Sequence, residues 1–271
     1  MIDIFIESKR KTSIACSIFN GGDNSPLLMM AHGFKSDRSE DNRFYDLANK
    51  LAENGISSIC MDFVGTGDSD EDFSLYSLDT CLDDLEVCYE YMLNNYSIDN
   101  KHMALLGYSM GGRIISLFNE KHREFNNLVF WAAYNDLVSI DDYFLKQSIK
   151  ELKKQVDEKG TCDFYNIFDE VFEVLSGDFI NNLLDYDALS CLNDFKGNAL
   201  IIQGNKDITI PLDSYKKIYD NLNHTNYKEL IIINGADHGF GLWDNRIKDS
   251  EELVEKSFEF LLKNLKENYC D

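Results

Sequence analysis

A serine stands among glycines in the segment GYSMGG, which runs from Gly107 to Gly112. In a G-x-S-x-G pattern the small residues on either side of the serine let the chain turn sharply and expose the hydroxyl. The preceding residues, 102–106, read as a short buried strand, and residues 113–119 have the apolar spacing of a helix. A serine on a strand-to-helix turn is a candidate nucleophile, so Ser109 directs the search for a base and a carboxylate.

A serine hydroxyl needs a neighbouring base to take its proton. The chain has five histidines, at positions 32, 102, 122, 224 and 238. His238 follows the apolar segment 229–233 and lies near the chain end, as the order serine, carboxylate, histidine requires. His102 lies at the wrong end of the strand before Ser109, and His122 and His224 fall in helix ends or connections. The sequence therefore predicts His238 as the base.

The base in turn needs a carboxylate that fixes its tautomer and stabilises the imidazolium. Asp207, in GNKDITIP, follows the apolar segment 199–203 and precedes a helical pattern. Asp136 follows the preceding strand and is the alternative, whereas Asp237 adjoins His238, and a sequence neighbour tends to point its side chain away. The prediction is Asp207.

The reaction also needs hydrogen-bond donors for the oxyanion, and backbone amides supply them with little reorganisation. One donor is the amide of Met110, directly after the serine. The second is expected from the loop HGF, residues 32–34, where the amide of Phe34 is suitably placed. His32 then has a structural role in holding this loop.

One segment that is rich in glycine and acidic residues was compared with two known ligand-binding loops and matches neither. In FVGTGDSD, residues 63–70, Asp70 occupies the position of the third glycine of a dinucleotide-binding loop. The acidic residues that follow lack the glycine and the spacing of a calcium loop. The segment is interpreted as a turn, and the sequence predicts no cofactor and no metal.

The elements that position these residues alternate along the chain. Continuous apolar strands that alternate with amphipathic helices predict an α/β fold, with a mostly parallel sheet of about eight strands and helices on both faces. Ligands bind such sheets at the carboxyl ends of the strands, where Ser109 lies. Strands are expected over 2–6, 12–19, 27–31, 56–63, 102–106, 127–132, 199–203 and 229–233, and helices over 44–53, 78–94, 212–221 and 250–266.

The alternation breaks between residues 134 and 193. Sixty residues between two core strands are too many for a loop in a compact domain, so an inserted cap is expected over the active-site end. The core then comprises residues 1–133 and 194–271. Two helical stretches are expected in the cap, over 141–159 and 166–184, with aromatic side chains at Tyr143, Phe144, Phe164, Tyr165, Phe168, Phe172 and Phe179.

Composition excludes several classes of protein. The net charge of −22 argues against a nucleic-acid partner, because a phosphate backbone requires a basic surface. The seven scattered cysteines argue against a disulfide framework and a structural zinc site. No segment approaches the roughly 20 apolar residues of a membrane helix, and the first residues lack a signal-peptide pattern. We expect a cytoplasmic protein without a membrane partner; a homodimer stays open.

With HGF, GYSMGG, GNKD and GADHGF in this order, the chain resembles the α/β-hydrolase superfamily over nearly its whole length. The segments HGFKSDRSEDNRFYDLANKLAENGI and MDFVGTGDSD look most like the bacterial feruloyl and cinnamoyl esterases and the related serine-aminopeptidase-like hydrolases.

The resemblance implies a serine carboxylic ester hydrolase that acts on a small-molecule ester through an acyl-enzyme. Its catalytic residues would be Ser109, Asp207 and His238, with the Phe34 and Met110 amides as the oxyanion hole. The same residues could serve a peptidase, a thioesterase or an acyltransferase, because the pocket distinguishes the substrates. A ligand-binding receptor on a hydrolase fold is the non-enzymatic alternative.

Overall fold

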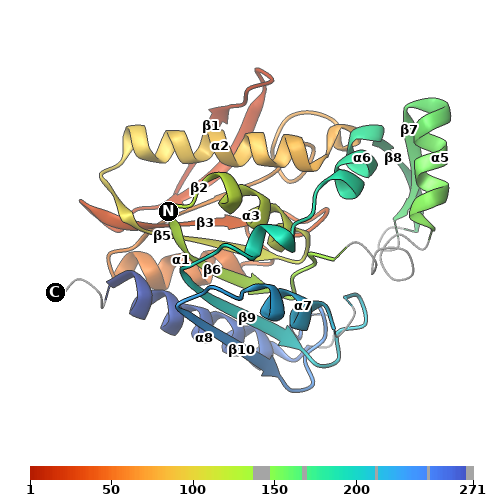
Figure 1. The fold of residues 1–271 in the computed structure, drawn as a ribbon. Helices are drawn as coiled ribbons and strands as arrows, with labels where there is room; N and C mark the ends of the chain where they lie inside the picture. Colours follow the sequence, from red (N-terminus) through yellow and green to blue (C-terminus); the bar gives the residue numbers. More distant parts are fainter. Residues whose placement is uncertain (137–146, 167–169, 211–212, 243–244, 267–271) are drawn as a thin grey trace.

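A computed structural model describes residues 1–136, 147–166, 170–210, 213–242 and 245–266. An eight-stranded sheet forms the centre of the molecule, with the strands in the order β1-β2-β4-β3-β5-β6-β9-β10 (Figure 1). Only β2 runs against its neighbours, and every pair from β4 to β10 is parallel. The expected mostly parallel sheet is therefore confirmed, and its first two strands form an antiparallel hairpin.

The bounds of the strands lie close to the expected ones. The strands of the large sheet are β1 (Ile2–Glu7), β2 (Ser13–Phe19), β3 (Ser25–Ala31), β4 (Ser57–Met61), β5 (Ile98–Tyr108), β6 (Phe125–Trp131), β9 (Asn198–Gly204) and β10 (Tyr227–Ile233). The helices around it are α1 (Arg43–Glu53), α2 (Leu78–Asn95), α3 (Met110–Lys121), α7 (Ser214–Asn221) and α8 (Ile247–Lys266), with a short 3-10 turn, η1 (Phe73–Leu75). Residues 211–212 of the helix expected over 212–221 lie outside the described residues.

Helices cover both faces of the sheet, so each face has its own hydrophobic core. Helices α2 and α3 pack on one face, and α1 and α8 pack on the other (Figure 1). Along β3, Leu27 and Met29 enter the first core, whereas Leu28 and Met30 enter the second. A strand that is buried on both faces must be apolar at successive positions, which is why the central strands are continuous apolar runs.

The segment between β6 and β9 departs from the expected all-helical cap. Its described part contains α5 (Ile149–Lys159), the hairpin of β7 (Thr161–Asn166) and β8 (Val171–Ser176), α6 (Gly177–Asp185) and the 3-10 turn η3 (Ser190–Leu192). The predicted helix over 166–184 is therefore wrong for residues 171–176, which form strand β8 (VFEVLS) and pair with strand β7 (TCDFYN). Periodicity alone does not separate short apolar runs into helix and strand, and these residues are rich in β-branched and aromatic side chains.

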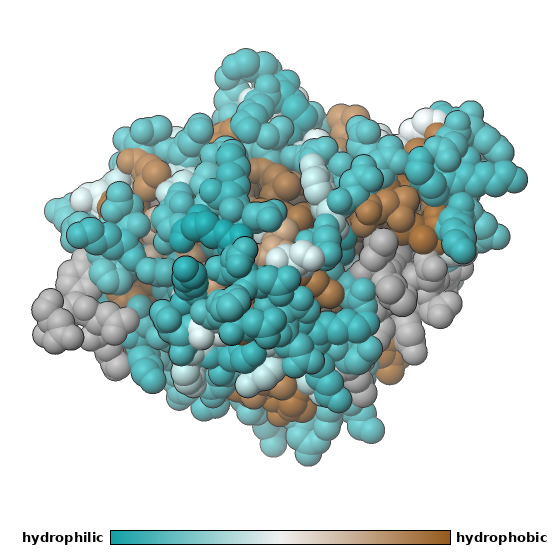
Figure 2. Space-filling model, viewed as in Figure 1, coloured by the Kyte–Doolittle hydropathy of each residue, from teal (hydrophilic) through white to brown (hydrophobic). Residues whose placement is uncertain are grey.

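The cap projects from one end of the sheet (Figure 1). Strand β8 lies against η1, and α6 lies against α2. Brown, apolar side chains gather over α6 and the hairpin in Figure 2; the exposed apolar residues of β8 are Val171, Phe172 and Val174. The expected cap residues 137–146 and 167–169, which include Tyr143, Phe144 and Phe168, lie outside the described residues.

Two further expectations concern the cysteines and the membrane. The six described cysteines, at positions 16, 60, 81, 88, 162 and 191, are buried free thiols, and Cys270 lies outside the described residues. In the part of the chain that the structure describes, no helix is both long enough and apolar enough to span a bilayer.

Candidate active site

Ser109 lies on the turn between β5 and α3 in a backbone conformation that few serines adopt. Its φ is 53° and its ψ is −117°, and a left-handed non-glycine residue costs about 1–3 kcal/mol. The turn is held on both sides, because the Ser109 N–H donates to the Trp131 carbonyl (2.9 Å) and the Tyr134 N–H donates to the Ser109 carbonyl (3.0 Å). The surroundings therefore stabilise the strained conformation that the G-x-S-x-G pattern predicts.

The glycines of this turn are required by close approach of the backbone. A Cβ added at Gly107 would lie 2.3 Å from the Gly111 carbonyl oxygen. A Cβ added at Gly111 would lie 2.0 Å from the Ala31 carbonyl oxygen. Both distances are far inside van der Waals contact, so α3 can begin directly above the ends of β3 and β5 only with glycine at these positions.

His238 connects the serine to the carboxylate. It follows β10, and its Nε2 lies 3.2 Å from Ser109 Oγ while its Nδ1 lies 2.8 Å from Asp207 Oδ2. A carboxylate beside Nδ1 selects the tautomer with the proton on Nδ1, and this leaves Nε2 free to accept the proton of the hydroxyl. The structure thus brings together the three residues that the sequence selected as a triad.

Several hydrogen bonds hold the carboxylate of Asp207 in place beside His238. Its Oδ1 accepts the N–H groups of Thr209 (2.8 Å) and Ile210 (2.9 Å), and its Oδ2 also accepts from Gln203 Nε2 (2.8 Å). Burial alone would raise the pKa of Asp207, but His238 and these donors outweigh burial, so its pKa lies below the ordinary value. The carboxylate is therefore charged beside the imidazole.

The two alternative carboxylates are engaged elsewhere. Asp136 forms an ion pair with Lys217 of α7. Asp237 turns away from the neighbouring ring, and its Oδ1 accepts the Gly241 N–H at 3.0 Å. The geometry accordingly favours Asp207 as the partner of His238.

His32 is a buried structural histidine, as expected from its place beside the HGF loop. Its Nδ1 lies 2.7 Å from the Gly33 carbonyl oxygen, and its Nε2 accepts the Phe63 N–H at 3.0 Å. Burial lowers the pKa of His32, which favours the neutral ring that these two bonds require. Thr66 of the FVGTGDSD turn also contacts Nε2, at 3.2 Å. The ring therefore joins the loop after β3 to the turn after β4.

The expected oxyanion donors lie on two elements beside Ser109. Met110 is the first residue of α3, where backbone N–H groups have no partner within the helix. Phe34 follows β3, and its ring packs against the cap residues Phe164 and Phe179, with ring centroids 5.4 Å away in both cases. Lys35 forms an ion pair with Glu173 of β8. The loop that carries the expected second donor is thus also where the cap contacts the core.

The remaining histidines lie away from this site. His102 pairs with Asp99 at the amino-terminal part of β5, and His122 ends α3 beside Glu86 and Glu124. His224 is exposed in the turn after α7. Within the described residues, histidine, cysteine and carboxylate side chains form no group of three or more that could hold a metal ion.

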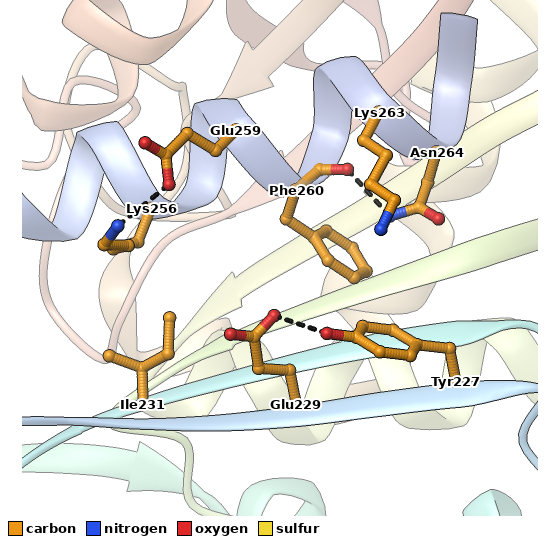
Figure 3. A pocket seen from close by; sticks show the side chains of 8 residues that line it. All are labelled: Tyr227, Glu229, Ile231, Lys256, Glu259, Phe260, Lys263 and Asn264. Atoms are coloured by element: carbon orange, nitrogen blue, oxygen red, sulfur yellow. Dashed lines mark hydrogen bonds and ion pairs between the residues drawn. The ribbon is translucent and has the colours of Figure 1, made fainter. Parts of the chain in front are cut away.

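A separate groove lies between β10 and α8 (Figure 3). It lies on the edge strand of the sheet and extends to Tyr227, the first residue of β10. Two pairs of its side chains bond to each other: Lys256 pairs with Glu259 at 2.9 Å, and the Tyr227 hydroxyl donates to Glu229 at 2.8 Å. The groove therefore begins at the amino end of β10, whereas His238 follows the carboxyl end.

Several polar residues that support the site were absent from the sequence prediction. Gln203 holds Asp207, Tyr108 contacts His238, and Glu40 and Arg43 contact the loops around Phe34 and His238. Tyr108 stands inside the GYSMGG segment and Gln203 ends a predicted strand, so position alone could have suggested them. Glu40 and Arg43 gave no such signal.

Known proteins resemble the chain in sequence. The family model for "Serine aminopeptidase, S33" matches residues 22–157, which is half of the chain. The chain belongs to this family. The hydrolase is also 24 % identical over 247 residues to the "AB hydrolase superfamily protein YisY" of Bacillus subtilis (strain 168), a match that covers 80 % of this chain and 86 % of that protein.

Solved structures share the fold of this α/β hydrolase. Est1E from Butyrivibrio proteoclasticus, in a structure with ferulic acid bound, superposes with a TM-score of 0.79 at 17 % identity, covering 96 % of this chain and 98 % of that one. The esterase Pf2001 from Pyrococcus furiosus gives a TM-score of 0.70 at 18 % identity, with 97 % and 90 % covered. At these identities the likeness establishes the fold.

Proposed function

We propose that this hydrolase cleaves carboxylic esters by way of an acyl-enzyme on Ser109. The observation that carries the proposal is the position of His238, whose two ring nitrogens reach Ser109 Oγ (3.2 Å) and Asp207 (2.8 Å). A serine that is held on a strained turn and hydrogen-bonded to an oriented imidazole is the arrangement needed for nucleophilic attack.

In the first half-reaction Ser109 Oγ attacks the ester carbonyl carbon while His238 Nε2 takes the hydroxyl proton. The carbonyl oxygen becomes an oxyanion that the N–H groups of Phe34 and Met110 stabilise. The tetrahedral intermediate collapses, the bond to the alcohol oxygen breaks, and Nε2 returns the proton to the leaving alcohol. The acyl group is then bound to Ser109.

In the second half-reaction a water molecule attacks the acyl carbon. His238 takes one proton from the water and later gives it to Ser109 Oγ as the acid leaves. Asp207 accepts a hydrogen bond from Nδ1 throughout and stabilises the imidazolium of each step. The hydrolase is thereby regenerated, and no cofactor or metal is consumed.

We propose hydroxycinnamoyl or short-chain acyl esters as the substrates. The fold shared with Est1E, whose structure contains ferulic acid, supports the first class. The same residues also suit amides, thioesters and acyl transfer, and the family description names an aminopeptidase. Initial rates with short-chain esters, a methyl hydroxycinnamate, aminoacyl anilides and acyl thioesters would separate these classes, and faster turnover of the anilides than of every ester would contradict the proposal.

The decisive variant is Ser109→Ala. It should lower kcat for p-nitrophenyl acetate by about 10⁴-fold, because the members of a triad act as a unit. It should also abolish labelling by a fluorophosphonate probe. Ser8→Ala is the control, since Ser8 is a buried serine next to the hairpin turn between β1 and β2, and its hydroxyl bonds to Thr12 and Arg10 of that turn. Parent turnover in a highly purified Ser109→Ala protein would show that the assignment is wrong.

A further inference from the structure

A buried ion pair lies beside the triad without belonging to it. Glu40 is 1 % exposed and Arg43 is 3 % exposed, and Arg43 Nη2 lies 3.2 Å from Glu40 Oε2. Taking two such charges out of water costs several kcal/mol per ion, so a buried pair is a poor source of stability by itself. The position of the pair therefore says more about its role than its contribution to stability does.

The two members of the pair hold two different loops of the site. Glu40 Oε1 accepts the Gly33 N–H at 2.6 Å, and Gly33 directly precedes the oxyanion donor Phe34. Arg43 Nη1 donates to the Gly239 carbonyl at 3.0 Å, and Gly239 directly follows His238. The pair thus joins the loop after β3 to the loop after β10, which are about 200 residues apart in sequence.

Tyr108 extends the same network to the strand that carries the nucleophile. Its hydroxyl donates to the His238 carbonyl at 3.0 Å, and its ring stacks on the His238 ring with a centroid distance of 5.2 Å. The Arg43 guanidinium lies over the Tyr108 ring, 4.8 Å from its centroid. A Cβ added at Gly33 would lie 3.1 Å from the Tyr108 ring, so this ring also touches the oxyanion loop.

The backbone before α1 is strained in a way that places the pair. Glu40, Asp41 and Asn42 are three successive non-glycine residues with positive φ, at 46°, 53° and 70°. Such residues persist only where the surrounding structure determines their conformation. Here the run turns the chain so that the side chains of Glu40 and Arg43 both face inward.

We propose that Glu40 and Arg43, with Tyr108, are positioning residues that fix the distance between the oxyanion donors and the general base. The inference rests on the proposed function, because it gives these loops their roles. Both half-reactions require donors and base in one geometry, and a misplacement of about 1 Å can lower the rate about 10²-fold. The network acts on the rate of the chemical steps and leaves substrate binding to other residues.

The test compares Glu40→Gln, Arg43→Met and Arg43→Lys by steady-state hydrolysis of p-nitrophenyl acetate. The temperature is kept well below the midpoint of thermal unfolding of the least stable variant. We expect Glu40→Gln and Arg43→Met to lower kcat about 10- to 100-fold, with KM within about twofold of the parent value. Arg43→Lys should recover part of kcat, since an ammonium keeps the charge but lacks the fork that reaches both Glu40 and Gly239.

A double-mutant cycle asks whether the two loops are coupled. Glu40→Gln acts on the oxyanion loop, and Tyr108→Phe removes only the hydroxyl bonded to the His238 loop. We expect the double variant to lose at least about threefold less kcat than the product of the single losses. This cycle also keeps the inference testable if Arg43→Met fails to fold.

Asp84→Asn is the matched control. Asp84 is another fully buried carboxylate that pairs with an arginine, Arg10 (2.8 Å), and accepts a backbone N–H, that of Val64 (3.2 Å). It should lower the unfolding midpoint and leave kcat within about twofold of the parent.

Three outcomes would overturn the inference: parent kcat in the folded Glu40→Gln and Arg43→Met proteins, a raised KM with unchanged kcat, or single losses that multiply in the cycle. Failure of the proposed function is a separate result, since Ser109→Ala would then keep parent activity. An inactive Ser109→Ala together with any of the three outcomes rejects the positioning role alone.

Discussion

At the scale of single residues, the carboxylate of Asp207 carries the clearest prediction. It accepts four hydrogen bonds, from His238, Gln203, Thr209 and Ile210. In Asp207→Asn an amide replaces the carboxylate, so Nδ1 of His238 loses the acceptor that fixes its tautomer. We expect kcat for p-nitrophenyl acetate to fall about 10⁴-fold with the fold intact.

The control for this variant is Asp136→Asn. Asp136 is the carboxylate that follows the neighbouring strand, and its ion pair with Lys217 ties it to α7. Its substitution should change kcat less than about twofold. A large loss in Asp136→Asn beside a small one in Asp207→Asn would reverse the assignment of the acid.

A second prediction at this scale concerns the titration of Glu40. Burial raises the pKa of Glu40 from 4.5 to about 7, and the opposing charge of Arg43 and the Gly33 N–H offset burial only in part. Asp37 raises this pKa further, and Asp41 lies 4.0 Å from Arg43. Between pH 4.5 and 7 the folded state therefore binds more protons at this position than the unfolded chain does.

The contribution of Glu40 to the free energy of unfolding is thus fully present below pH 4.5 and is lost as pH rises to about 7. In Glu40→Gln the glutamine side chain has no proton to gain or lose over this pH range. From pH 5 to pH 7 we expect the free energy of unfolding of the parent to fall relative to that of the variant by about 2 kcal/mol. Urea unfolding at several pH values measures this; a difference that is constant or that rises with pH would contradict the raised pKa.

The extent to which the site could be predicted follows from where each residue stands in the chain. Ser109, Asp207 and His238 each follow an apolar strand, and parallel strands place their carboxyl ends at one edge, so position and residue type sufficed to predict that they lie together. Glu40 and Arg43 act across the fold, and Arg43 meets Gly239 at a separation of 196 residues. No local pattern encodes such a contact, and a charged residue before a helix is ordinarily solvated.

At the scale of elements, the hairpin β7–β8 shows why one pair of strands could not be predicted from the sequence. The core strands were predictable because burial on both faces makes them continuous apolar runs, as β3 and β4 illustrate. Strand β8 is mostly exposed, and only Leu175 in it is buried. Its pairing with β7, rather than its own pattern, makes it a strand.

The ion pair between Lys35 and Glu173 ties this hairpin to the loop after β3, and Glu173→Gln tests its effect. The pair is partly exposed and should contribute at most about 1 kcal/mol. We expect amide hydrogen exchange to rise about two- to fivefold in 161–166 and 171–176, measured by mass spectrometry, with the sheet strands unchanged.

Asp157→Asn is the control for this variant, since it removes an ion pair with Lys153 that lies wholly within α5. It should leave exchange in the hairpin at the parent rate. Equal protection of the hairpin in Glu173→Gln and the parent would show that the Lys35 contact does not restrain the cap, and that the packing of Phe164 on Phe34 is sufficient.

At the scale of the whole molecule, the dominant property is the net charge of −22. The summed field of such a protein repels anions in solution, and salt screens this repulsion. The Debye length falls from about 30 Å at 0.01 M to about 8 Å at 0.15 M ionic strength. A substrate that carries a carboxylate should therefore meet the hydrolase more slowly than a neutral one, and the difference should shrink as salt is added.

Two acetate esters test this, 4-acetoxybenzoate and its methyl ester, which have the same acyl group and differ mainly in one charge. We expect kcat/KM for the anionic ester to rise several-fold between 0.01 M and 0.15 M sodium chloride, while kcat/KM for the methyl ester stays within about 1.5-fold. Release of the phenol is followed for both esters, so the same proposed acetyl transfer to Ser109 is measured in each. If the two esters responded equally to salt, the net charge would not control how fast an anionic ester reaches the hydrolase.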